Sequence, residues 1–151
     1  MALAAAQVVT VLAARLDALP AYTGRVFTSR RWPLADADLP AWRLYATDEA
    51  VARVAIGANV NRHQVEIAVV GHVAATADLD DALNAMAADA SAALFEVTAP
   101  TTIDELAPYA LQLLGIRRAE SAEGEAALGT VTLTVQAEIF VDAAHPETIL
   151  S

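Results

Sequence analysis

The stretch TVTLTVQAEIFV, residues 130–141, decides the fold that we expect for this chain. Apolar and polar side chains alternate along it almost without interruption. Because successive side chains of a β-strand point to opposite faces of the sheet, this period of two predicts a strand with one buried face. The side chains expected to face inward are Val131, Leu133, Val135, Ala137, Ile139 and Val141, and those expected to face outward are Thr130, Thr132, Thr134, Gln136 and Glu138. Such a pattern is typical of an antiparallel sheet that is covered on one side.

Other stretches supply partners for this strand. Residues 111–119 are strand-like and are joined to it by an acidic turn at residues 120–125, which predicts a long hairpin at the C-terminal end. Residues 64–73 alternate in the same way, with Val65, Ile67, Val69 and Gly71 on one face. Shorter or weaker strands are expected at residues 22–28, 42–45 and 51–56.

Two helices are available to cover the sheet. In the first, residues 3–19, the apolar positions Val8, Leu12, Leu16 and Leu19 share one face, Arg15 and Asp17 lie away from it, and Pro20 ends the helix. The second begins after Asp78, has two aspartates in its first turn, and carries the apolar stripe Leu79, Leu83, Met86, Ala90 and Leu94. We therefore expect one α+β domain over residues 1–151: a single mostly antiparallel sheet, two main helices packed on one face, and a long hairpin arm at the C-terminal end.

Composition excludes several classes of protein. The chain has 151 residues, no cysteine and a net charge of −10, and all nine of its basic residues are arginine. It has no apolar run of the roughly 20 residues that span a membrane, and residues 1–21 lack the basic start of a signal peptide. An acidic chain is also poorly suited to gripping nucleic acid, which needs clustered cations. A soluble acidic α/β protein remains.

No catalytic set emerges from the sequence. The three histidines, His63, His72 and His145, have no metal-ligand spacing, and His72 is interpreted as structural or surface-exposed. The glycines are dispersed, so there is no phosphate-binding loop, and the serines lack a nucleophile motif. Asp80 and Asp81 fit the first turn of a helix better than a metal site. We predict that the chain is not an enzyme and has no catalytic residue, metal ligand or cofactor.

Two charged segments are candidates for contacts with a partner. The long loop at residues 29–40 contains Arg30, Arg31 and Trp32, of residue types enriched in interface hot spots, followed by Asp36 and Asp38. The expected hairpin tip contains Glu120, Glu123 and Glu125, which could pair with a basic loop of another subunit. A solvated loop and a soluble turn remain the alternative interpretations. Phe140, on the otherwise polar side of its strand, indicates that this side is also covered.

The order of these segments resembles the tail terminator, or tail completion, proteins of long-tailed bacteriophages, of the minor tail protein U type. The resemblance covers most of the chain and rests on segment order instead of one diagnostic motif. It is carried by the N-terminal helix and Gly24–Phe27, the loop Arg30–Pro33, the strand entry Leu39–Tyr45 with Asp48 and Glu49 after it, the strand and helix at residues 64–73 and 78–86, and the hairpin strand that starts at Gly129–Leu133.

The resemblance implies a structural protein of the virion, assembled in the cytoplasm of the bacterial host. Such proteins form a homo-oligomeric ring, expected to be a hexamer, on the head-proximal end of the tail tube. The implied partners are the tail tube protein and a head–tail connector or neck protein, with no membrane and no specific nucleic-acid binding.

The acidic charge would let DNA pass through the ring without sticking. A role for a divalent cation in assembly stays open. The alternatives are another neck or tail-tube component, and a small acidic ligand-binding or accessory domain.

Overall fold

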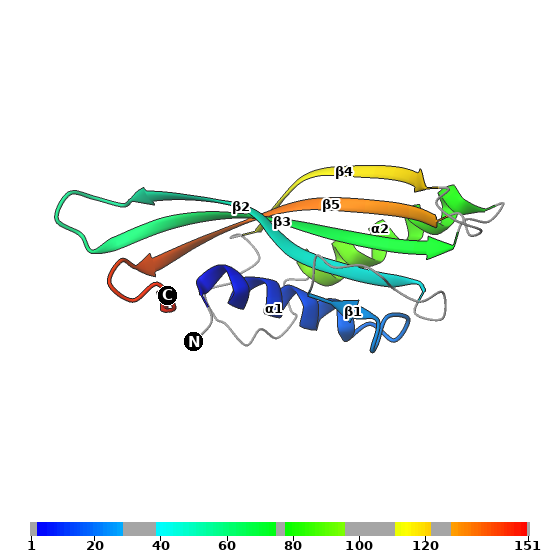
Figure 1. Ribbon diagram of the computed structural model, residues 1–151, viewed down its shortest axis with the longest axis horizontal. Helices are drawn as coiled ribbons and strands as arrows, with labels where there is room; N and C mark the ends of the chain where they lie inside the picture. Colours follow the sequence, from blue (N-terminus) through cyan, green and yellow to red (C-terminus); the bar gives the residue numbers. More distant parts are fainter. Residues whose placement is uncertain (1–2, 29–38, 75–77, 96–110, 122–127, 151) are drawn as a thin grey trace.

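A computed structural model of the chain describes residues 3–28, 39–74, 78–95, 111–121 and 128–150. Two helices and six strands follow one another along these segments (Figure 1). In chain order they are α1 (Ala4–Asp17), β1 (Val26–Phe27), β2 (Ala41–Arg53), β3 (Val60–Ala74), α2 (Leu79–Phe95), β4 (Leu111–Ser121), β5 (Leu128–Asp142) and β6 (Ile149–Leu150).

The strands form one sheet in the order β1-β2-β3-β5-β4, and the short β6 pairs with β5. The β1–β2 pair is parallel and every other pair is antiparallel, so the expected α+β class is confirmed. The two longest strands, β3 and β5, pair along their whole lengths at the centre, from Val60 opposite Asp142 to Ala74 opposite Leu128. The expected C-terminal hairpin is present as the pair β4–β5.

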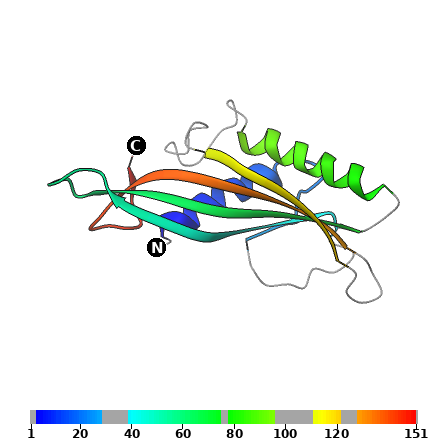
Figure 2. The same ribbon diagram turned by 90° about the horizontal axis from the view of Figure 1, so that it is seen from above.

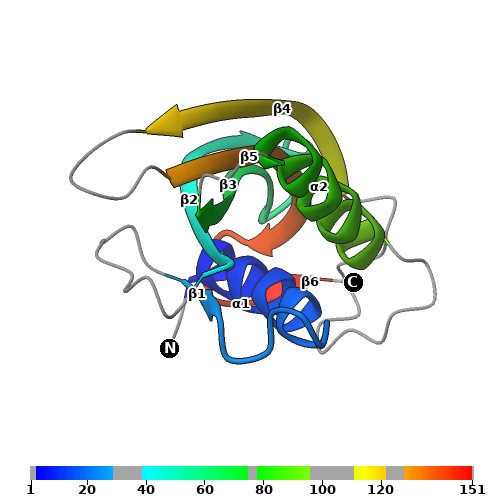
Figure 3. The same ribbon diagram turned by 90° about the vertical axis from the view of Figure 1, so that its right-hand side faces the viewer.

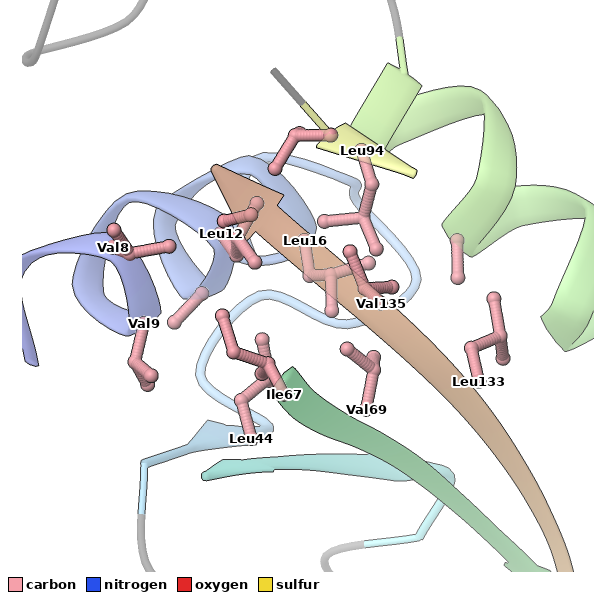
Figure 4. Close-up of a cluster of buried hydrophobic side chains, with 14 of the residues drawn as sticks. Val8, Val9, Leu12, Leu16, Leu44, Ile67, Val69, Leu94, Leu133 and Val135 are labelled. Carbon is pink, nitrogen blue, oxygen red and sulfur yellow. The ribbon is translucent and has the colours of Figure 1, made fainter. Parts of the chain in front are cut away.

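Both helices lie on the same side of this sheet (Figures 2 and 3), as the sequence predicts. All six inward positions predicted for β5 are buried, with at most 1% of each exposed. Figure 4 shows how side chains of both helices meet the inner face of the sheet: Val8, Val9, Leu12, Leu16 and Leu94 lie against Leu44, Ile67, Val69, Leu133 and Val135. Close packing leaves little room here, since a Cβ on Gly71 would come within 2.9 Å of both Met86 and Trp42.

One residue of α1 departs from the prediction. Arg15 was expected on the solvent side of the helix, but it is buried and only 7% exposed. Its Nη1 donates a hydrogen bond of 2.7 Å to the carbonyl oxygen of Leu94, in the last turn of α2. Burial lowers the pKa of Arg15 from its ordinary value. The prediction of a helix here is correct, but the predicted exposure of Arg15 is wrong because its guanidinium finds a hydrogen-bond acceptor inside the protein.

The strands expected at residues 42–45 and 51–56 belong to one continuous strand, β2, which already ends at Arg53, so residues 54–56 lie in the turn and not in a strand. The polar residues between them interrupt the apolar alternation, which is why the sequence suggests a break. In the structure β2 pairs with β3 throughout, and an irregularity between Ala46 and Asp48 absorbs the change of pattern. As a result the β2–β3 hairpin is long, and its turn projects beyond the helices (Figures 1 and 2).

Candidate assembly interface

The described part of the chain holds no obvious centre for chemistry. Its His, Asp and Glu residues form no group of three or more that could hold a metal ion. His63 Nδ1 lies 2.6 Å from Glu49 Oε1, while His145 is on an exposed turn. None of the helices in the described ranges is long and apolar enough to cross a membrane. The features of the described chain that fit contact with a partner are exposed apolar side chains and open strand edges.

His72 has a structural role, as the sequence indicates. It lies on the outer face of β3, the face turned away from the helices, yet only 5% of it is exposed. Arg43 Nε donates a hydrogen bond of 3.0 Å to His72 Nε2, so the imidazole accepts it in its neutral form. Burial and then the charge of Arg43 lower the pKa of His72 from 6.5 to about 4. The ring is a neutral acceptor at physiological pH.

The first exposed surface is the β4 edge, residues 111–116 of β4. β4 is the last strand of the sheet, and the described chain places no strand on its outer side. Three of its large apolar side chains remain exposed: Leu113 at 36%, Leu114 at 46% and Ile116 at 40%. A register shift between Leu113 and Gly115 bends the strand at this point. Proteins usually protect such edges with charge or a covering element, so an apolar edge indicates a contact surface.

The second exposed surface is the finger, residues 50–62, which comprises the end of β2, the turn and the start of β3. Val51 and Val54 are about half exposed, at 54% and 50%, and Ile56 is fully exposed. β1 pairs with β2 only at Trp42 and Arg43, so among the described residues the rest of this side of β2 is also an open edge. The two open edges, on β2 and β4, lie on opposite sides of the sheet.

The outer face of the sheet is mostly polar. Thr132 and Thr134 border a shallow depression of about 330 Å³ beside β4, which Gly115, Ile116 and Arg117 also line. Further along the face Asp48 and Glu66 are directly opposite on adjacent strands, and such like-charged pairs destabilise a sheet. This negative charge lies on β2 and β3, whereas β4 carries Arg117 and Arg118 directly after its exposed apolar residues.

Most of the side chains singled out from the sequence lie outside the described residues. This holds for the loop residues Arg30, Arg31, Trp32, Asp36 and Asp38, and for Glu123 and Glu125 of the acidic turn. Glu120 is described: it is exposed near the end of β4, opposite Gly129. Phe140 is 40% exposed.

The β4 edge and the finger were not predicted from the sequence as contact surfaces. Their exposure follows from strand order and hairpin length, which local residue patterns do not reveal. The sequence held one signal for the finger: the apolar residues Val54 and Ile56 lie directly before Gly57, a residue type common in turns.

Comparisons with known proteins find similarity among solved structures. No family model matches the chain, and no curated protein matches it. Among solved structures, the chain is similar to one in a structure described as "Virion of native gene transfer agent (GTA) particle". The two are 18% identical, with a TM-score of 0.41, over 85% of this chain and 84% of that chain.

Proposed function

We propose that this chain is a structural protein of a long-tailed bacteriophage, whose copies form a closed ring on the head-proximal end of the tail tube. The observation that carries the proposal is the pair of open strand edges, on β2 and β4, at opposite sides of one sheet. The tail-terminator resemblance in segment order supplies the biological setting. In that setting the ring stops growth of the tube and offers a surface for joining the head.

The two edges favour a ring over a two-fold dimer. The finger and the β4 edge differ in sequence and shape, so a contact between them uses unlike surfaces on the two copies. Head-to-tail contacts of this kind close into rings when the rotation between copies allows it, and otherwise continue as filaments. A terminator requires closure, whereas a tube component requires continued growth.

The size of the particle in solution tests the proposal. Light scattering from the purified protein, over a range of concentrations and with and without Mg²⁺, should give one discrete mass, and the resemblance leads us to expect that of a hexamer. The mass should not increase further with concentration. Open-ended filaments would instead identify a tube component, and a monomer under all conditions would refute a ring.

One face of the ring, which includes the loop at residues 30–38, is proposed to contact the last ring of the tube. Reversing the charge of this loop with Arg30→Glu and Arg31→Glu should leave the fold and ring mass unchanged but produce overlong or unjoined tails when the variant replaces the natural protein. Electron microscopy of the particles measures tail length and joining. A pair of glutamates on the exposed side of α1, at Thr10 and Ala14, is the matched control and should give normal tails. Normal, joined tails from the arginine variant would remove the loop from the contact.

A further inference from the structure

We propose that residues 143–150, which we call the strap, form a clamp that couples the finger to the first turn of α1. The strap follows β5, turns back on itself and ends in β6, and it lies beside the start of α1 (Figures 1 and 2). The coupling lies within a single copy and does not depend on the proposed ring. The finger and the start of α1, which are far apart in the sequence, should therefore loosen together.

The strap supplies a cap that α1 itself lacks. Leu3, at the N-cap, makes no side-chain hydrogen bond to the helix, and the first turn has no acidic residue. The amide of Ala4 instead donates a hydrogen bond of 3.4 Å to the carbonyl of Pro146 in the strap. Gln7 Nε2 donates a second one, of 2.6 Å, to the carbonyl of Glu147. Because the first amides of a helix have no acceptor within it, the strap satisfies one of them and holds the start of α1.

The beginning of the strap contacts the base of the finger. The amide of Ala143 donates a hydrogen bond of 3.0 Å to the carbonyl of Asn59. Asp142, the last residue before the strap, bonds both segments through one carboxylate oxygen. Its Oδ1 accepts from the amide of Ala144 at 2.8 Å and from Asn59 Nδ2 at 3.5 Å. The strap is therefore joined to the finger at one end and to α1 further along.

The strap also supports the strand that lies alongside the finger. β4 pairs with β5 only as far as Ala137. Beyond that point β6 is the strand that the described chain places on this side of β5, with Ile149 opposite Val141. On their other side the last residues of β5 pair with the part of β3 that belongs to the finger, starting with Asp142 opposite Val60. Because a two-stranded ribbon alone is only marginally stable in water, the finger depends on this third strand.

Opening of the strap breaks contacts at both of its ends. It removes the acceptors at the start of α1 and the β6 pairing that supports the end of β5. Residues 143–146 are exposed, so little buried surface holds the strap closed. Local openings of this kind occur in native proteins at a lower free energy than global unfolding. Since coupling between two sites is reciprocal, a change at either end of the strap should alter the other end.

Hydrogen exchange of the intact protein at low concentration, read by mass spectrometry, tests the coupling. Gln7→Met removes the side-chain donor to the strap, and the amides of the finger are then measured. Because one hydrogen bond changes an opening equilibrium about fivefold, exchange across residues 50–62 should become about fivefold faster. Exchange across residues 131–137, the buried centre of β5, should stay unchanged and so show that the variant is folded. Thr10→Ala is the matched control, because Thr10 is exposed on α1 and bonds within its own helix, and it should leave the finger unchanged.

The reverse experiment changes the finger end of the strap and measures the helix. Asp142→Ala removes the carboxylate that bonds both Asn59 and the strap, and exchange across residues 4–8 should also become faster. Unchanged exchange of the finger in Gln7→Met, or of the start of α1 in Asp142→Ala, overturns the coupling even if the strap itself exchanges faster. The mass of the particle in solution tests the proposed ring separately, so either idea can fail without the other.

Discussion

At the scale of single residues, His72 links the stability of the sheet to pH. Its neutral ring accepts the hydrogen bond from Arg43, and protonation would remove the acceptor and place two cations 3.0 Å apart. Because the folded-state pKa of about 4 lies below the ordinary 6.5, the unfolded chain takes up this proton first as the pH falls. The stabilisation is therefore complete above pH 6.5 and is lost progressively as the pH falls towards 4.

The variant His72→Gln tests this dependence. It should be less stable than the natural protein at neutral pH, but its free energy of unfolding should fall less between pH 6.5 and 4, because the group that titrates is gone. Urea unfolding at several pH values measures the difference in slope. The control His145→Gln alters an exposed histidine on the turn after β5 and should keep the natural slope. Parallel slopes for the natural protein and His72→Gln would contradict the assigned role of His72.

Residue patterns predict burial well where one face of an element meets the core. The alternation along β5 identifies its buried positions, and the helical spacing identifies Leu12 and Leu16 as buried. The same reasoning wrongly places Arg15 on the solvent side of its helix. Its hydrogen-bond acceptor is the carbonyl of Leu94, 79 residues further along the chain, and a local sequence pattern does not reveal such a contact. Contacts of this kind depend on how helices meet in space, which is not encoded in local periodicity.

At the scale of elements, Arg15 joins the two helices. Its guanidinium binds the Leu94 carbonyl in the last turn of α2, where the partial negative charge of the helix end favours a cation. Arg15→Met keeps the apolar stem but leaves that carbonyl without this donor, so we expect a loss of about 1–3 kcal/mol in the free energy of unfolding. Chemical denaturation of the variant measures this loss.

Arg118→Met is the matched control for this prediction. Arg118 also binds α2, through a hydrogen bond of 2.9 Å from its Nε to Asn84 Oδ1, but this contact is exposed. Exposed interactions of this kind contribute little, so the control should lose less than about 1 kcal/mol. Equal losses in the two variants would show that burial of Arg15 does not strengthen its contact.

The candidate interface depends on the arrangement of elements and was beyond prediction from residue patterns. The β4 edge is open because β5, not β4, lies beside β3, and this order comes from pairings between distant segments. The finger arises because β2 continues through Asp48 and Glu49, where a polar sequence suggests a loop. The contacts that the sequence predicts at residues 29–40 and 120–125 stay predictions, and of Glu120 the structure shows only that it is exposed.

At the scale of the whole molecule, the net charge of −10 has a consequence for the proposed ring, through which we expect DNA to pass. Nonspecific affinity for DNA comes mainly from cations that displace counterions from the phosphates. With nine arginines against 19 carboxylates in each copy, the assembled ring should repel the duplex. Charge of this sign allows DNA to slide through a pore that it does not bind.

Fluorescence anisotropy of a labelled duplex tests this consequence on the intact ring. We expect no binding by micromolar ring at about 0.15 M salt, and none on dilution to about 0.05 M, where electrostatic attraction would strengthen any contact. A basic DNA-binding protein in the same buffers is the positive control. Binding that grows as salt is lowered would mean that the few arginines are gathered along the DNA path, and would contradict a repulsive lumen.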